Sequence, residues 1–269
     1  MPVLKMDKAG VIGLPTGIKD ITRADFRNDM WIRAIEAKGY RVAWSRTAQC
    51  PCKSVADQTD QADPNCTLCN GAGWIFFRPE GAVVNPKIIG PLDAIQQVVV
   101  NDNAAVIHGI MTGFGNAKKP WEALGPRLEG TSNLTVRAEN KLGYYDRITC
   151  LDAKIVYSQL IKVISPSLTI KTKYPVVSMN LLRTKTQVFV LGTDYQVVNG
   201  DIVWVSGRAP AKDELLVCHY LCHPTYRVIE HPHNTRLTLT KFKIKQPLTP
   251  QGEPTDLPVQ AVLRYEFLL

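Results

Sequence analysis

The sequence lacks any long hydrophobic run. None of its apolar stretches approaches the roughly 20 residues that a helix needs to span a bilayer, although 45% of the 269 residues are hydrophobic. The first twenty residues also lack the apolar core of a secretory signal peptide. We therefore expect synthesis in a cytoplasm and no membrane partner. Structural disulfides are disfavoured in that compartment.

Motifs of the common enzyme classes are missing as well. The sequence contains no Gly-x-x-x-x-Gly-Lys-Ser/Thr phosphate loop, no His-Glu-x-x-His metalloprotease motif and no Gly-x-Ser-x-Gly nucleophile elbow. It also contains no internal repeat and no low-complexity tract. We expect a protein that is not an enzyme, with an unrecognised catalytic activity as an alternative.

Acidic residues are in the minority. The chain has 24 Asp and Glu against 32 Lys and Arg, which gives a formal net charge of +8. The excess is spread along the chain, as in a solvated mixed surface, but it also permits contact with nucleic acid or an acidic partner. Lys241, Lys243 and Lys245 alternate with apolar residues. Such a basic strand face either protects a sheet edge or contacts phosphates or an acidic neighbour.

Helical periodicity is clear in one place only. Thr22 and Asp25 resemble a capping box, an apolar face follows at i, i+4 spacing, and Gly39 stands where a helix would end. Before this helix, residues 1–20 carry Gly and Pro at short intervals and predict an extended arm.

Most of the chain after Trp74 reads as short strands rich in β-branched and aromatic residues. The Asn199-Gly200 pair between apolar residues is a strong signal for a hairpin turn. The expected strands cover residues 94–100, 132–139, 147–157, 186–192, 195–205, 214–221, 226–231, 236–245 and 259–269.

These elements predict a mainly β protein with two β-sandwich- or barrel-like domains. The first domain is discontinuous, over 81–152 and 224–269, and a β-sandwich-like domain over 153–223 is inserted into it. In front of them lie the extended arm, over 1–20, and a segment over 21–80 with one amphipathic helix and a four-cysteine cluster that resembles a zinc knuckle.

Four of the seven cysteines fall in two close pairs near the N-terminus. The ligand candidates are Cys50, Cys52, Cys66 and Cys69. Four thiolates from two facing turns satisfy a tetrahedral zinc ion and leave no open coordination position, so one structural zinc per chain is expected. The Cys-Pro-Cys pair is tighter than the usual two-residue gap, and disulfides or free thiols stay open as alternatives.

The remaining cysteines and histidines predict packing and not ligation. Cys218 and Cys222 share one face of an expected strand, while His219 and His223 share the other. Ligands split across two faces make a poor tetrahedral site. The segment 231–233 places two imidazoles on one face, but no third ligand is evident.

The order of short motifs resembles that of a known class of virion proteins. The helix leads into Trp44-Ser45-Arg46 and Cys-Pro-Cys, and the second cysteine pair continues into Asn-Gly-Ala-Gly-Trp. Farther on stand Leu142-Gly143-Tyr144-Tyr145-Asp146-Arg147-Ile148, Gly192-Thr193-Asp194-Tyr195, Ile202-Val203-Trp204 and Tyr226-Arg227-Val228-Ile229-Glu230-His231-Pro232-His233. This order resembles virion structural proteins of tailed bacteriophages, of the neck or head-to-tail connector (collar) type.

The resemblance implies a β-rich, non-enzymatic protein that forms a homo-oligomeric ring in the virion after synthesis in the host cytoplasm. Its partners would be copies of itself and other neck, portal-side or tail proteins, with backbone contact to DNA in a channel. The alternatives are a tail or baseplate component, or a zinc-containing nucleic-acid-binding protein. The acidic loop over 56–63 is unlike that of a DNA-reading zinc finger.

Overall fold

A computed structural model describes residues 28–53, 62–63, 66–69, 73–84, 89–101, 103–113, 130–163, 169–231, 237–239, 254–256 and 258–269. The expected arm over 1–20, the helix start at Thr22 and the basic strand face over 241–245 lie outside these residues. No helix within them is long and apolar enough to cross a membrane.

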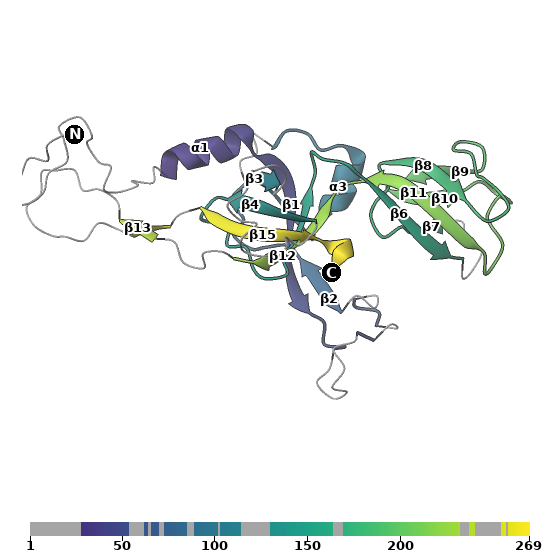
Figure 1. The fold of residues 1–269 in the computed structure, drawn as a ribbon, viewed down its shortest axis with the longest axis horizontal. Helices are drawn as coiled ribbons and strands as arrows, with labels where there is room; N and C mark the ends of the chain where they lie inside the picture. The colour runs from purple at the N-terminus through teal and green to yellow at the C-terminus, as the bar shows by residue number, and fades with distance from the viewer. Residues whose placement is uncertain are drawn as a thin grey trace, which may run out of the picture.

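The protein is mainly β, and its centre is a closed six-stranded antiparallel barrel (Figure 1). Strand β5 pairs with β1 as well as with β12, and this pairing closes the sheet and leaves no free edge among the six strands. In spatial order the strands are β1 (Tyr40–Gln49), β3 (Ala105–Gly113), β4 (Thr131–Val136), β15 (Val259–Tyr265), β12 (Thr225–Glu230) and β5 (Arg147–Cys150).

Alternating side chains from all six strands fill the barrel. Strand β4 shows the pattern most clearly, since every second residue is buried. The core includes Val42, Trp44, Ile107, Leu134, Val136, Ile148, Val228 and Leu263. Helix α1 (Asn28–Lys38) packs against β3, and the amide of Gly39 donates to the Ile35 carbonyl at 2.8 Å where this helix turns into β1.

The strand expected over 94–100 is wrong, because these residues form helix α3 (Ala94–Val100). A capping box overrides the β propensity of three consecutive valines. The Asp93 carboxylate accepts from the Gln96 amide at 2.7 Å, and the Gln96 side chain accepts from the Asp93 amide at 3.1 Å. Val99 and Val100 then pack against the outer wall of the barrel, so these apolar residues are partly buried without joining a sheet.

Three strands in the first part of the chain were not expected from the sequence. They are β1, β2 (Trp74–Phe77) and β3. The segment 21–80 therefore contains more than a helix and a cysteine cluster, since β1 supplies a wall of the barrel. The middle residues of β1 are buried on both faces, between the barrel core and the layer under α3. Burial on both faces removes the polar alternation by which a strand is recognised.

A second β unit lies between β5 and β12 in the chain and beside the barrel in space (Figure 1). One of its sheets has the order β6 (Ile155–Lys162), β11 (Leu215–Cys222), β8 (Ser178–Arg183), and the other has the order β7 (Thr169–Ile170), β10 (Asp201–Trp204), β9 (Tyr195–Val198). The two sheets enclose a separate core that includes Leu182, Trp204, Leu216 and Tyr220. We call this unit the insert.

Several details of the insert differ from the expected strands. The hairpin turn is confirmed, with Asn199 and Gly200 at φ 53° and 80° between β9 and β10. The run over 186–192 forms only isolated bridges, at Val188 and Leu191. The run over 147–157 is divided by a turn at 151–152 into β5 of the barrel and β6 of the insert, and β8 was not expected.

The two chain crossings between barrel and insert lie side by side. Ile155 at the start of β6 pairs with Cys222 at the end of β11. The Cys150 amide donates to the Pro224 carbonyl at 3.0 Å, and His223 Nδ1 lies 2.9 Å from the Ala153 carbonyl oxygen. The insert therefore enters and leaves the barrel at one point.

Candidate metal centre

A two-stranded ribbon projects from the barrel (Figure 1), and the four cysteines lie at its tip. The first half of β1 belongs to the barrel, but its second half pairs with β2, from Arg46 opposite Phe77 to Gln49 opposite Trp74. Cys50 follows β1 directly, and Gly73 precedes β2. The strand pairing therefore brings the two cysteine-bearing segments to the same end of the ribbon.

Asp146 fixes the base of the ribbon. Its side chain is 2% exposed and accepts from Trp44 Nε1 at 2.8 Å, the Gly143 amide at 2.7 Å and the Thr47 amide at 3.2 Å. Arg46 adds an ion pair at 3.3 Å. A buried carboxylate is tolerated only where such donors replace water. Asp146 thus joins the turn before β5 to the point at which β1 leaves the barrel.

The structure brings all four candidate cysteines together. Their sulfur atoms all lie within 4.8 Å of one another. The Cys50 and Cys66 sulfurs are 3.7 Å apart, and those of Cys52 and Cys69 are 3.5 Å apart. A tetrahedral site with Zn–S bonds of about 2.3 Å has sulfur–sulfur edges of about 3.8 Å. The four cysteines are free thiols, so the set can hold a metal ion.

Backbone groups around the cluster support the sulfur atoms. The Gly73 amide points at the Cys69 sulfur from 3.2 Å, and Gly73 has a positive φ of 73°. The Cys50 amide donates to the Gly73 carbonyl at 3.0 Å and so closes the tip of the ribbon. Amide donors to ligand sulfurs stabilise thiolates and orient them for a metal.

The thiols of the cluster have unequal acidity in the metal-free chain. Burial raises the pKa of the Cys52 thiol to about 12. Burial acts in the same direction on Cys69, but the Gly73 amide and the three neighbouring thiols outweigh it and lower its pKa to about 7. Of these two thiols, Cys69 is therefore the one that ionises more readily near neutral pH. Metal binding must displace the proton of Cys52.

The other cysteines are packed in the two cores. Cys218 and Cys222 are fully buried on the inner face of β11, where burial raises the pKa of their thiols to about 12 and about 11. His219 lies on the opposite face, with Nδ1 2.7 Å from Ser158 Oγ. Cys150 is buried in the barrel. Among the described residues, the four ribbon cysteines alone form a cluster of three or more metal-ligating side chains.

His231 also has a packing role among the described residues. Its ring makes an edge contact with Tyr144, at 4.8 Å between ring centroids. The other half of the expected pair, His233, lies outside the described residues.

Sequence reasoning missed the charged residues beside the ribbon. Arg147 and Arg227 pair with Glu266 at 3.3 and 2.6 Å, although the three residues are far apart in sequence. The motif around Tyr145 contains two of the relevant positions, Asp146 and Arg147. The sequence around these two charged residues does not indicate their partners, because β5 and β12 become neighbours only when the barrel closes.

Comparison with protein-family models finds no match, and comparison with curated proteins finds none either.

Proposed function

We propose that this chain is a structural subunit of a tailed-bacteriophage virion and forms a ring in the neck or head-to-tail connection. The order of sequence motifs supports the family, and one feature of the insert supports assembly. The outer face of the sheet β6–β11–β8 carries exposed apolar side chains among polar ones: Val156, Leu160 and Leu215 are 54%, 67% and 56% exposed, and the Ser158–His219 pair lies between Val156 and Leu160. Exposed apolar side chains that gather on one face mark a contact with another protein when the patch is large.

The register of the strands makes these residues one surface. Leu160 pairs with Val217, and Val156 pairs with Leu221, so side chains of β6 and β11 stand in adjacent rows. The inward residues of both strands belong to the core of the insert. The outer residues therefore make no contribution to that core, and we assign the surface to a neighbouring copy of the chain. Head-to-tail contacts between copies close into a ring.

Zinc is the metal we assign to the ribbon. Tetrahedral sites with four sulfurs take zinc or iron, and zinc is the redox-inert ion that structural four-cysteine sites use. A closed site with four protein ligands leaves no position for water or substrate. In this proposal the metal holds the ribbon and takes no part in chemistry.

Native mass spectrometry with negative-stain electron microscopy tests the assembly. The wild-type chain is expected to form closed rings, and Leu160→Glu is expected to give folded monomers because the new carboxylate would be buried without a partner. Val198→Glu is the matched control, since Val198 is 44% exposed on β9 of the other sheet. If Leu160→Glu forms the same rings as the wild type, the contact between subunits lies elsewhere.

A wild-type chain that is monomeric at all concentrations would overturn the ring proposal. If such a monomer bound DNA with strong salt dependence, the zinc-containing nucleic-acid-binding protein would become the better function.

A further inference from the structure

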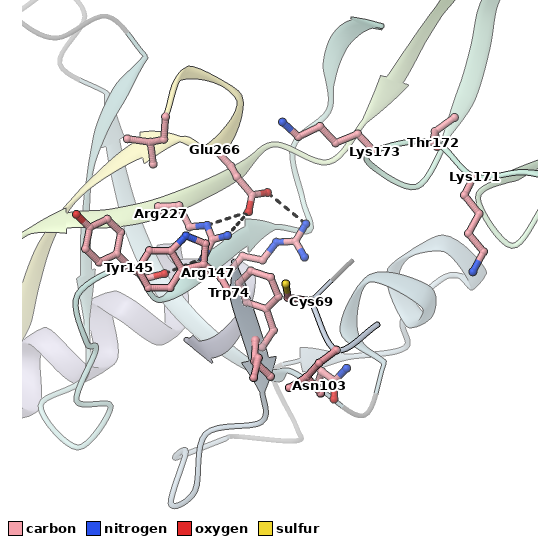
Figure 2. A pocket seen from close by; sticks show the side chains of 14 residues that line it. Cys69, Trp74, Asn103, Tyr145, Arg147, Lys171, Thr172, Lys173, Arg227 and Glu266 are labelled. Carbon is pink, nitrogen blue, oxygen red and sulfur yellow. Dashed lines mark hydrogen bonds and ion pairs between the residues drawn. The ribbon is translucent and has the colours of Figure 1, made fainter. Parts of the chain in front are cut away.

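A cleft lies where the ribbon, the barrel and the insert meet (Figure 2). Its volume of about 1210 Å³ exceeds the range of roughly 300–1,000 Å³ of small-molecule sites. The ribbon contributes Cys69 and Trp74, the barrel contributes Arg147 and Arg227, and the insert contributes the segment 171–173. The cleft is large enough for a segment of a polymer chain.

The lining of the cleft is strongly basic. Arg147, Arg227, Lys171 and Lys173 line it together with a single acidic side chain, that of Glu266, and with the last residue, Leu269. Glu266 pairs with both guanidinium groups, at 3.3 and 2.6 Å, while no ion pair among the described residues engages either lysine. In Figure 2 the ammonium group of Lys173 points toward the Glu266 side of the cleft.

The arginines are recessed and partly engaged. The side chains of Arg147 and Arg227 are 29% and 9% exposed, and both contact the Phe76 ring, at 4.9 and 4.4 Å from its centroid. Arg147 Nε is nevertheless buried without a hydrogen-bond partner. A buried donor in this position costs free energy unless an acceptor reaches it.

The aromatic rings of the cleft already have partners. Trp74 stacks on Tyr145 at 5.0 Å between centroids, and the Lys53 ammonium lies 4.7 Å from the Trp74 ring centroid. Phe76 carries the two guanidinium contacts described above. Single-stranded nucleic acids bind largely by stacking of bases on aromatic rings, and Trp74 and Phe76 already carry such contacts. Phosphates on the outside of a duplex would also not reach a guanidinium that is 9% exposed.

We propose that the cleft binds a carboxylate-rich segment of a neighbouring protein chain. The inference rests on the proposed function, because the neighbour would be another virion subunit. Carboxylates would pair with Lys171 and Lys173, and apolar side chains between them would contact Leu68 and Ile75, which also line the cleft. Carboxylate groups pair with guanidinium and ammonium groups by charge-assisted hydrogen bonds.

Fluorescence anisotropy of a labelled peptide of alternating glutamate and leucine, at low ionic strength, tests the cleft. We expect the wild-type chain to bind it and Lys171→Glu/Lys173→Glu to bind about tenfold more weakly, a loss of about 1.4 kcal/mol. The control Lys185→Glu/Lys212→Glu makes the same change of charge at exposed positions of the insert that do not line the cleft, and it should bind like the wild type.

Three results would overturn the proposal: no binding by the wild type, an equal loss in the control, or tighter binding of an oligothymidylate of equal charge that depends on the same two lysines. The last result would assign the cleft to nucleic acid. Peptide binding and ring formation are measured independently of each other. Wild-type rings that do not bind the peptide would refute the cleft alone, while a monomer that binds it would refute the ring alone.

Discussion

The ribbon and the insert both project from the same barrel, but different forces hold them. The insert has two sheets and a core of its own, with Leu216, Tyr220 and Ile202 fully buried. The ribbon has two short strands, and its side chains Leu68 and Phe77 are 60% and 45% exposed. A two-stranded ribbon is at best marginally stable in water. The comparison indicates that hydrophobic burial folds the insert, whereas the tip of the ribbon has little core and carries four cysteines that can hold a metal ion.

The largest effect is expected from Cys66→Ser, which removes one sulfur ligand from the ribbon. Structural zinc contributes on the order of 10 kcal/mol of folding free energy to small sites. We expect loss of the metal and rapid hydrogen exchange over roughly residues 45–75, while amides of the barrel and insert stay protected. Cys222→Ala, which removes a buried thiol of the insert, should retain the metal. If Cys66→Ser retains the metal, the ribbon is not held by a four-cysteine site, and the proposed difference between ribbon and insert is wrong.

A smaller effect, spread over the barrel, is expected from Asp146→Ala. The substitution leaves Trp44 Nε1 and the Gly143 amide without their acceptor. Removal of one partner from a buried charged network costs about 3–5 kcal/mol, which urea unfolding measures. Asp213→Asn is the control, because Asn tolerates the positive φ of 66° at this position. The Lys162 and Asp213 side chains are 62% and 61% exposed, and such an ion pair is worth about 0–1 kcal/mol. Equal costs for the two variants would contradict the role of Asp146.

The smallest of the three effects is expected from Leu216→Ala, and it should be confined to the insert. Leu216 is fully buried in the insert core, and truncation of a buried leucine costs about 2–5 kcal/mol according to how far the cavity collapses. Peptide-resolved hydrogen exchange should show the loss in β6–β11 and not in β4 or β15. Val198→Ala, at a position of the insert that is 44% exposed and lies on the other sheet, should change little. Equal loss of protection in the barrel would show that the two units unfold together.

The sequence was sufficient where a short-range signal decides the structure. The Asn199-Gly200 turn needs only two residues with positive φ, and the four cysteines were recognisable because thiolates in close pairs have few other uses. The sequence was insufficient where distant contacts decide. Residues 94–100 have β propensity, but the bond between Asp93 and Gln96 and the barrel wall make them a helix.

The cleft is a second case in which contacts between distant residues could not be predicted from the sequence. Arg147 occurs in a motif that was visible in the sequence, but Arg227 and Glu266 reach it only because β5, β12 and β15 are neighbours in a closed sheet. Nothing local to these residues predicts that neighbourhood. A charged residue in a strand therefore gives no indication of its partner until the topology is known.

The metal content of the wild-type chain, purified without added metal, tests most directly the claim that a metal holds the ribbon. Elemental analysis should find one zinc per chain, and a colourless protein would exclude an iron–sulfur centre. After chelation, hydrogen exchange should rise in the ribbon and remain unchanged in the insert. Less than a tenth of an equivalent of any metal, with a ribbon that is equally protected before and after chelation, would contradict the account.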